Sequence, residues 1–296
     1  MTLFLGILMA LTCALATNVG FLFKHRGARQ APPVDMRHPL RTARALFGTR
    51  MFAIGMAIAT FAWAFHVAAL SLAPLSLVQS VLAGGIVLLA VMAERLFGLR
   101  IGRRQWFGLA ATAIGLILLG VTLPATHGAD SHYSLPGMIA FEAGLVAGGM
   151  LLAMGPRIGA PREHHGYMLG AAAGILFGVS DLGIKAIAGQ VTGGAGAAGF
   201  VTPWFLVALA ASVGAFYASA KALQDGDAVP VIAITGTTAN VAGIVGGVLV
   251  FGDPLAGSPV ALAVQSIAFV LVLLAAWLMP APVRAARGLL PTPAAA

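Results

Sequence analysis

The chain has 296 residues, of which 59% are hydrophobic and 9% are charged, and its mean hydropathy is +0.96. A soluble domain carries about 25% charged residues, so this composition excludes an ordinary soluble fold and predicts a membrane protein. The net charge of +8 does not indicate a nucleic-acid partner, because the cations lie in short segments between apolar runs.

Nine apolar runs are long enough to cross a bilayer, which takes about 20 helical residues. They cover residues 2–23, 51–70, 74–96, 105–123, 136–154, 166–188, 203–222, 228–251 and 259–279. We interpret the first run as a retained helix, because no Lys or Arg precedes it as in a signal peptide. Its Cys13 is the one cysteine of the chain, which excludes an intramolecular disulfide and a cysteine metal cluster. We expect no cofactor.

Proline stands at or near the start of five of these runs, where its missing N–H costs nothing. These residues are Pro74, Pro136, Pro203, Pro230 and Pro259. The pattern supports separate helices on either side of residues 71–73.

The cations predict the orientation. If nine helices alternate, all but one of the 17 Lys and Arg residues fall on the same side, and Lys185 is the exception. Cytoplasmic loops carry an excess of cations, so we expect the N terminus outside and the C terminus inside a cell membrane, of bacterial plasma-membrane type. Segment 24–50 is then a basic cytoplasmic loop near anionic headgroups, and residues 280–296 form a disordered tail.

Two stretches indicate an internal repeat. ALSLAPLSLVQSVLAGG begins at Ala69 and ALQDGDAVPVIAITGTTANVAG begins at Ala222, and each is followed by a short break and a last apolar helix. The second to fourth helices thus repeat as the seventh to ninth, in opposite orientation. Inverted repeats of this kind build many transporters, with the substrate bound between them. We expect an all-α inverted-repeat bundle, with one repeat over residues 1–123 and the other over 136–279. The alternative is that these polar and small residues only allow close packing.

Three stretches resemble the drug/metabolite transporter superfamily with its EamA-type repeats. They are AALSLAPLSLVQSVLAG, AERLFGLRIGRRQWFGLAATAIGLILLG and GAAAGILFGVSDLGIKAI. Among nine-helix members, the chain is similar to NIPA-type magnesium transporters in FLFKHRGA and LAPLSLVQ. The resemblance implies a membrane transporter that lacks one helix near the N terminus. Where it implies acidic and asparagine residues in the second helix, this chain has Trp63 and His66, which favours a solute other than magnesium.

Polar side chains at one depth predict a site. Glu142 and Asp181 lie six or seven residues from the outer ends of their helices, roughly 9–11 Å deep at about 1.5 Å per residue. His66, Gln79 and Gln265 fall at a similar depth. Intramembrane residues of this kind are expensive and indicate functional sites, so we expect them to share one vestibule. We expect the deeper cavity to be lined by Trp63, Thr235 and Asn240.

Each of these assignments has a structural alternative. Asp181 is four residues from Lys185 and can pair with it on one helix face. Thr235 and Asn240 can serve as interhelical hydrogen-bonding residues. Glu142 has no local partner and is the stronger candidate for proton or cation binding. Glycines at four-residue spacing predict close-packing faces. They are Gly170, Gly174 and Gly178, Gly144 with Gly148, and Gly243 with Gly247.

These features favour a secondary transporter of a small polar solute or metabolite that works by alternating access. The sequence has no G-x-x-x-x-G-K-[ST] nucleotide-binding loop. One alternative is a NIPA-type Mg²⁺ permease that uses Glu142 and Asp181 as metal ligands, because Mg²⁺ prefers oxygen. A remote alternative is a non-transporting scaffold. We expect no enzyme, and as partners a solute or ion, the lipid bilayer and, as an open alternative, a second copy of the chain.

Overall fold

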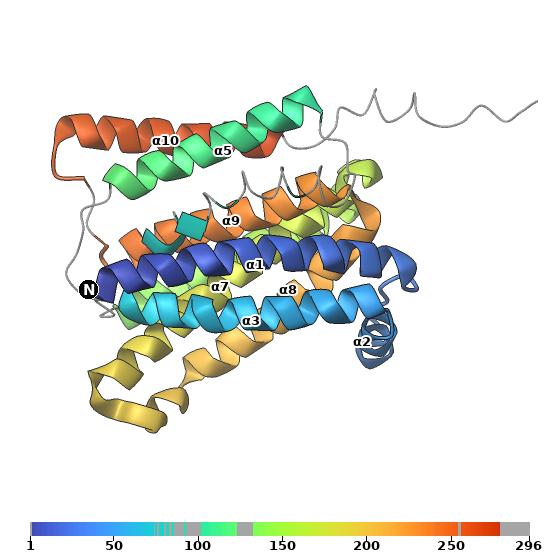
Figure 1. Ribbon diagram of the computed structural model, residues 1–296, viewed down its shortest axis with the longest axis horizontal. Coiled ribbons are helices and arrows are strands. Elements are labelled where there is room, and N and C mark those ends of the chain that lie inside the picture. The colour runs from blue at the N-terminus through green and yellow to red at the C-terminus, as the bar shows by residue number, and fades with distance from the viewer. Residues whose placement is uncertain are drawn as a thin grey trace, which may run out of the picture.

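The computed structural model describes residues 2–73, 75, 77–79, 81–82, 85, 92, 102–122, 133–253 and 256–278. The regular structure of these residues is helical, without strands, as predicted. The long elements are α1 (Thr2–Gln30), α2 (Pro39–Phe47), α3 (Arg50–Leu72), α5 (Arg103–Thr122), α6 (Leu135–Ala153), α7 (His165–Gln190), α8 (Pro203–Asp225), α9 (Ala228–Leu249) and α10 (Pro259–Leu278) (Figure 1). Most of the predicted helix 74–96 lies outside the described residues.

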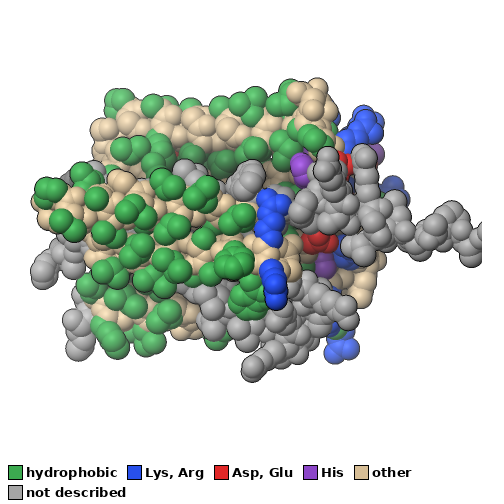
Figure 2. All heavy atoms as spheres, turned by 90° about the horizontal axis from the view of Figure 1, so that it is seen from above, with side chains coloured by type: hydrophobic (Ala, Val, Ile, Leu, Met, Phe, Trp, Pro, Cys, Tyr) green, Lys and Arg blue, Asp and Glu red, His purple; other side chains and the backbone are tan. Residues whose placement is uncertain are grey.

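Six described helices are long and apolar enough to cross a membrane. They are Leu3–Gln30, Arg50–Leu72, Leu135–Ala153, Arg162–Phe200, Pro203–Asp225 and Ala228–Leu249. Figure 2 shows hydrophobic side chains over most of one face, with Lys and Arg gathered at one end of the molecule. That distribution suits a bundle whose middle lies in lipid, while the count of nine spans stays a prediction.

We call the end of the bundle that holds α2 and the C-terminal ends of α1 and α8 the cationic end. Two expectations for this end are wrong. α1 continues to Gln30, past the predicted end at residue 23, and α2 forms inside the predicted loop 24–50. Hydropathy marks where the apolar stretch stops, but backbone hydrogen bonds carry a helix further through residues such as Lys24 and Arg29.

Proline positions agree with the prediction at three helix starts. Pro136 stands in the first turn of α6, where the Ser134 side chain also accepts a hydrogen bond from the Gly137 N–H. Pro203 and Pro259 are the first residues of α8 and α10. Proline has no N–H to lose in a first turn, so these residues fix where the helices begin.

Glycines bring the helices of each half together. On α1, Gly20 lies against the backbone of Gly55 on α3, and Gly27 lies against Phe52. The two helices therefore run antiparallel in close contact. α7 packs in the same way against α8, and Gly183 faces Trp204 and Ala208.

The predicted packing of the α7 glycines is confirmed. Gly170 lies against Thr235, Gly174 against Thr238 and Gly178 against Ala242, all on α9. The expectation for Gly144 and Gly148 is wrong within the described chain, because no described atom lies within 4 Å of a Cβ placed at either residue. These glycines lie on a part of α6 that does not face α7.

The last helices of the two proposed repeats, α5 and α10, pack mainly against each other. The pair lies along one side of the bundle next to α9 (Figure 1). The contacts between this pair and the other described helices are few. Residues on α10 are therefore set apart from those on α3 and α7.

Candidate functional site

A carboxylate on α7 that is 13% exposed joins the two halves of the chain. Oδ1 of Asp181 lies 2.8 Å from Nε2 of His66 on α3, and Oδ2 accepts a 2.7 Å hydrogen bond from Nε2 of Gln79. His66 is 8% exposed and Gln79 is 1% exposed. We call these three residues the Asp181 cluster. It brings together three of the predicted site residues, from helices far apart in sequence.

The surrounding small residues make room for the cluster. The antiparallel contact between α1 and α3 places Cys13 beside the His66 ring. On α9, Gly243 lies directly against the side chain of Gln79, where a Cβ would overlap it. The small side chain of Cys13 and the absence of a Cβ at Gly243 therefore leave space for the side chains of His66 and Gln79.

Glu142 lies on the face of α6 that packs against α7. Gly149 lies against Ile175 of α7, and Glu142 is about two helical turns before Gly149 on the same face of α6. Glu142 is 6% exposed, and its Oε1 has no hydrogen-bond partner among the described residues. That Glu142 and Asp181 lie at one level stays a prediction.

Lys185, one turn from Asp181, holds the end of α3. It is fully buried, and its Nζ donates 3.0 Å hydrogen bonds to the carbonyls of Leu70 and Ala73. Those carbonyls lie at the C-terminal end of α3, where a cation is favourable. The alternative role for Asp181, as a counter-charge for Lys185, does not account for its hydrogen bonds to His66 and Gln79.

Three other predicted site residues have different surroundings. Trp63 is 55% exposed, so the expectation that it lines an inner cavity is not supported. It follows the buried Ala62 by one residue, which turns it about 100° around the helix. Thr235 donates to the Gly170 carbonyl at 2.9 Å and acts as an interhelical hydrogen-bonding residue. Asn240 is 6% exposed on α9.

Gln265 does not have the neighbours that were predicted for it. It is 2% exposed on α10, and its Oε1 lies 3.5 Å from the backbone N of Ala256, in the segment that leads into the same helix. α10 packs mainly against α5. Depth alone could not distinguish this side of the bundle from the interior.

Two polar residues that connect elements were not among the predicted site residues. Asn18 on α1 donates to the carbonyls of Ala14 and Gly85, at 3.0 and 2.9 Å. An asparagine inside an apolar run was a visible signal of such a contact. The second residue is Gln224 at the C-terminal end of α8, which had no comparable signal.

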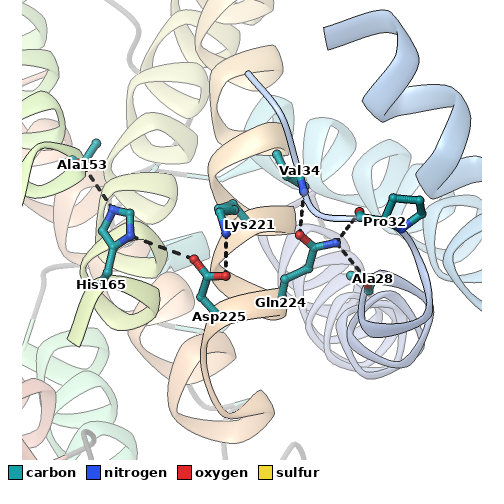
Figure 3. Close-up of polar contacts among 8 residues, drawn as sticks. All are labelled: Ala28, Pro32, Val34, Ala153, His165, Lys221, Gln224 and Asp225. Atoms are coloured by element: carbon teal, nitrogen blue, oxygen red, sulfur yellow. Dashed lines mark hydrogen bonds and ion pairs between the residues drawn. The ribbon is translucent and has the colours of Figure 1, made fainter. Parts of the chain in front are cut away.

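Gln224 ties the segment after α1 to α8 at the cationic end (Figure 3). Its Oε1 accepts from the Val34 N–H at 2.8 Å, and its Nε2 donates to the carbonyls of Ala28 and Pro32 at 2.9 and 3.0 Å. Beside it, Asp225 pairs with Lys221 at 2.6 Å. Both the oxygen and the nitrogen of the Gln224 amide are hydrogen-bonded, so this junction has a defined geometry.

The described residues do not include a group of three or more His, Cys, Asp or Glu side chains placed to hold a metal ion. Both oxygens of Asp181 have hydrogen-bonding partners. A cation at this level would have to replace those partners and recruit Glu142 or water, because Mg²⁺ demands near-octahedral oxygen coordination.

The chain is a multi-pass membrane protein. It is similar to the probable magnesium transporter NIPA9 of Arabidopsis thaliana, at 23% identity over 267 residues that cover 86% of this chain and 75% of the plant protein. No protein-family model and no solved structure matches it. The similarity agrees with the NIPA-type resemblance in the sequence, while the EamA-type repeat stays a prediction.

Proposed function

We propose that the chain is a secondary transporter that moves a small polar solute or metabolite across a cell membrane by alternating access. The observation that carries this proposal is the Asp181 cluster. A carboxylate inside the membrane is costly, and here it is held by side chains from the other half of the chain. These contacts lie where two rearranging halves would meet.

The chemistry of the cluster suits a polar solute. Gln79 and His66 supply groups that hydrogen-bond to Asp181, and the same groups can hydrogen-bond to a solute that competes for the carboxylate. In one state Asp181 would bind His66 and Gln79, and in the other it would bind the solute. The solute would then bind one state more tightly than the other, which a ligand needs in order to shift a conformational equilibrium. Glu142, at the same level, is the proposed coupling residue for a proton or cation.

The proposed architecture has nine spans, with the N terminus outside, the C terminus inside and two inverted repeats. Two features of the packing support it. The pairs α1–α3 and α7–α8 are the main antiparallel contacts of their halves, and the last helices of the two repeats, α5 and α10, lie together. An approximate two-fold axis would relate these elements in that way.

A Mg²⁺ permease is the second candidate, favoured by the similarity to a probable magnesium transporter. In that case Asp181, Glu142 and the Gln79 amide oxygen would supply oxygen ligands, with the remaining coordination positions filled by water. The two candidates share one location and differ in the substrate.

Thermal unfolding of the purified chain in detergent tests both. A bound substrate should raise the unfolding midpoint of the wild type, since ligands that bind the native state stabilise it. We expect one member of a panel of Mg²⁺ and small polar metabolites to do so, and Asp181→Asn to lose the effect. Asp225→Asn, at the cationic end, is the matched control. A folded wild type that responds to no member of a broad panel would favour a scaffold.

A further inference from the structure

We propose that α2 is an interfacial helix that binds the anionic phospholipid headgroups of the leaflet at the cationic end. α2 crosses the bundle direction, because Figure 1 shows it nearly end-on while α1 and α3 run across the picture. A helix in this position lies along a membrane surface. The inference does not depend on what the chain transports.

The exposed face of α2 has two chemically different edges. Thr42 and Leu46 are buried against the protein. At about 100° per residue, the opposite face carries Leu40 and Phe47 along one edge and Arg41 and Arg44 along the other. Leu40 is 85% exposed and Phe47 is 47% exposed, and both arginines are exposed. An apolar edge beside a cationic edge is the pattern of helices that lie in the headgroup region.

Hydrogen bonds and ring contacts fix this face in place. The Tyr217 hydroxyl on α8 donates to the Pro39 carbonyl at 2.9 Å. The Thr42 hydroxyl donates to the Asp35 carbonyl at 2.9 Å, and the Phe47 ring stacks on Phe216 with centroids 6.1 Å apart. Because α2 is already ordered by these contacts, lipid binding would not be weakened by the entropy cost of folding the helix.

The charge around α2 favours anionic lipid. Arg37, just before the helix, adds a third exposed cation. The nearby acid, Asp35, lies 2.9 Å from Nδ1 of His38. The hydrogen bonds from His38 and from the Arg37 backbone N–H lower the pKa of Asp35, so its charge is committed to local partners. The arginines remain available to lipid phosphates, to which guanidinium groups bind well.

A single fluorescent probe on α2 tests the proposal in the full chain. The variant is Leu40→Cys in a Cys13→Ser background, labelled with an environment-sensitive fluorophore; Cys13 is the one native cysteine. The protein is placed in nanodiscs of phosphatidylcholine, alone or mixed with phosphatidylglycerol. Quenching by acrylamide, a neutral aqueous quencher, measures how far residue 40 is withdrawn from water. We expect less quenching in the mixed discs.

Arg41→Gln with Arg44→Gln should abolish this difference. Each cation near an anionic surface favours the bound state about five-fold, so losing two should cost about thirty-fold. The matched control, Arg157→Gln with Arg162→Gln, removes two exposed cations elsewhere and should keep the difference. Equal quenching in both lipids would overturn the proposal and leave α2 free for a soluble partner. The proposal would also be overturned if the variant without Arg41 and Arg44 kept the same difference in quenching between the two lipids as the control variant.

Discussion

His66 and Asp181 are 115 positions apart in the sequence, and the Nε2 of one lies 2.8 Å from the Oδ1 of the other. The contact joins α3 in the first half of the chain to α7 in the second. With 10% and 13% of their side-chain surfaces exposed, the two groups are largely shielded, and Gln79 is the second hydrogen-bond partner of the carboxylate. The relationship is structural and, under the proposed function, the one that transport must break.

A double-mutant cycle tests the interdependence of this pair. His66→Leu removes the partner of Oδ1 and should destabilise the folded protein by about 1–3 kcal/mol, because it leaves a shielded carboxylate oxygen without its hydrogen-bond partner. Asp181→Leu should destabilise by a similar amount. The double variant should unfold, in a thermal melt in detergent, at a midpoint no lower than that of the worse single variant. Additive losses would mean that the two groups are not coupled.

Substitution by Met should destabilise the protein much more at Lys185 than at Lys221. Lys185→Met leaves the carbonyls of Leu70 and Ala73 without a buried donor, and should lower stability by about 2–6 kcal/mol, because each unsatisfied buried acceptor costs about 1–3 kcal/mol. Lys221 is 31% exposed and pairs with Asp225 on its own helix, so Lys221→Met should cost less than about 1 kcal/mol. Thermal melts of both variants, side by side, check this. Similar losses would contradict a capping role for Lys185.

Gly174 should be intolerant of a methyl group. A Cβ there would overlap the side-chain oxygen of Thr238 and the carbonyl of Thr235, so Gly174→Ala should cost about 1–3 kcal/mol by forcing α7 from α9. Gly148 has open space around the same position, and Gly148→Ala should leave the melting midpoint unchanged or raised. Midpoints that fall equally would show that α7 and α9 are not in the close contact described.

The sequence predicted the helical fold and most helix starts because proline and hydropathy are local signals. Counting residues along a helix also predicts a shared level for Glu142 and Asp181, which stays a prediction. The sequence could not predict which way a residue faces. Trp63 and His66 are less than one turn apart, yet one is exposed and the other is buried. That difference depends on where α1 and α7 pack, which no local pattern encodes.

The same limit explains Gln265. Its predicted depth was that of the other polar residues, but α10 packs mainly against α5. The junction at Gln224 was also out of reach, because its partners are backbone groups of Ala28, Pro32 and Val34. Backbone acceptors and donors are present at every residue, so no sequence feature marks the ones that a distant side chain will use.

Gln224→Ala should release the segment after α1. The substitution removes the amide that holds the Val34 N–H and the two carbonyls, while the helix end of α8 remains. We expect trypsin to cleave after Arg37 several times faster than in the wild type, with little change in the global melting midpoint. Gln105→Ala, which removes an exposed contact to the Gly102 N–H, is the control. An unchanged cleavage rate would show that the hydrogen bonds of Gln224 do not hold the segment after α1 in place.

Glu142→Met should separate stability from function. Oε1 has no described hydrogen-bond partner, and an unsatisfied buried polar atom costs about 1–3 kcal/mol, so the apolar variant should melt at the same or a higher temperature. If Glu142 is the coupling residue, transport driven by an ion gradient should be lost in the same variant. A lower midpoint would assign Glu142 a structural role instead.

Solute flux into proteoliposomes shows whether the chain is a transporter and whether Asp181 is part of its site. Wild type, Asp181→Asn and Asp225→Asn, each confirmed as folded, are reconstituted and exposed to Mg²⁺ and to the metabolite panel. The account predicts that at least one of these solutes enters with the wild type and with Asp225→Asn, and that Asp181→Asn loses this flux. Equal flux through all three proteins would contradict the assignment of the site, and no flux of any solute through the folded wild type would contradict the proposed function.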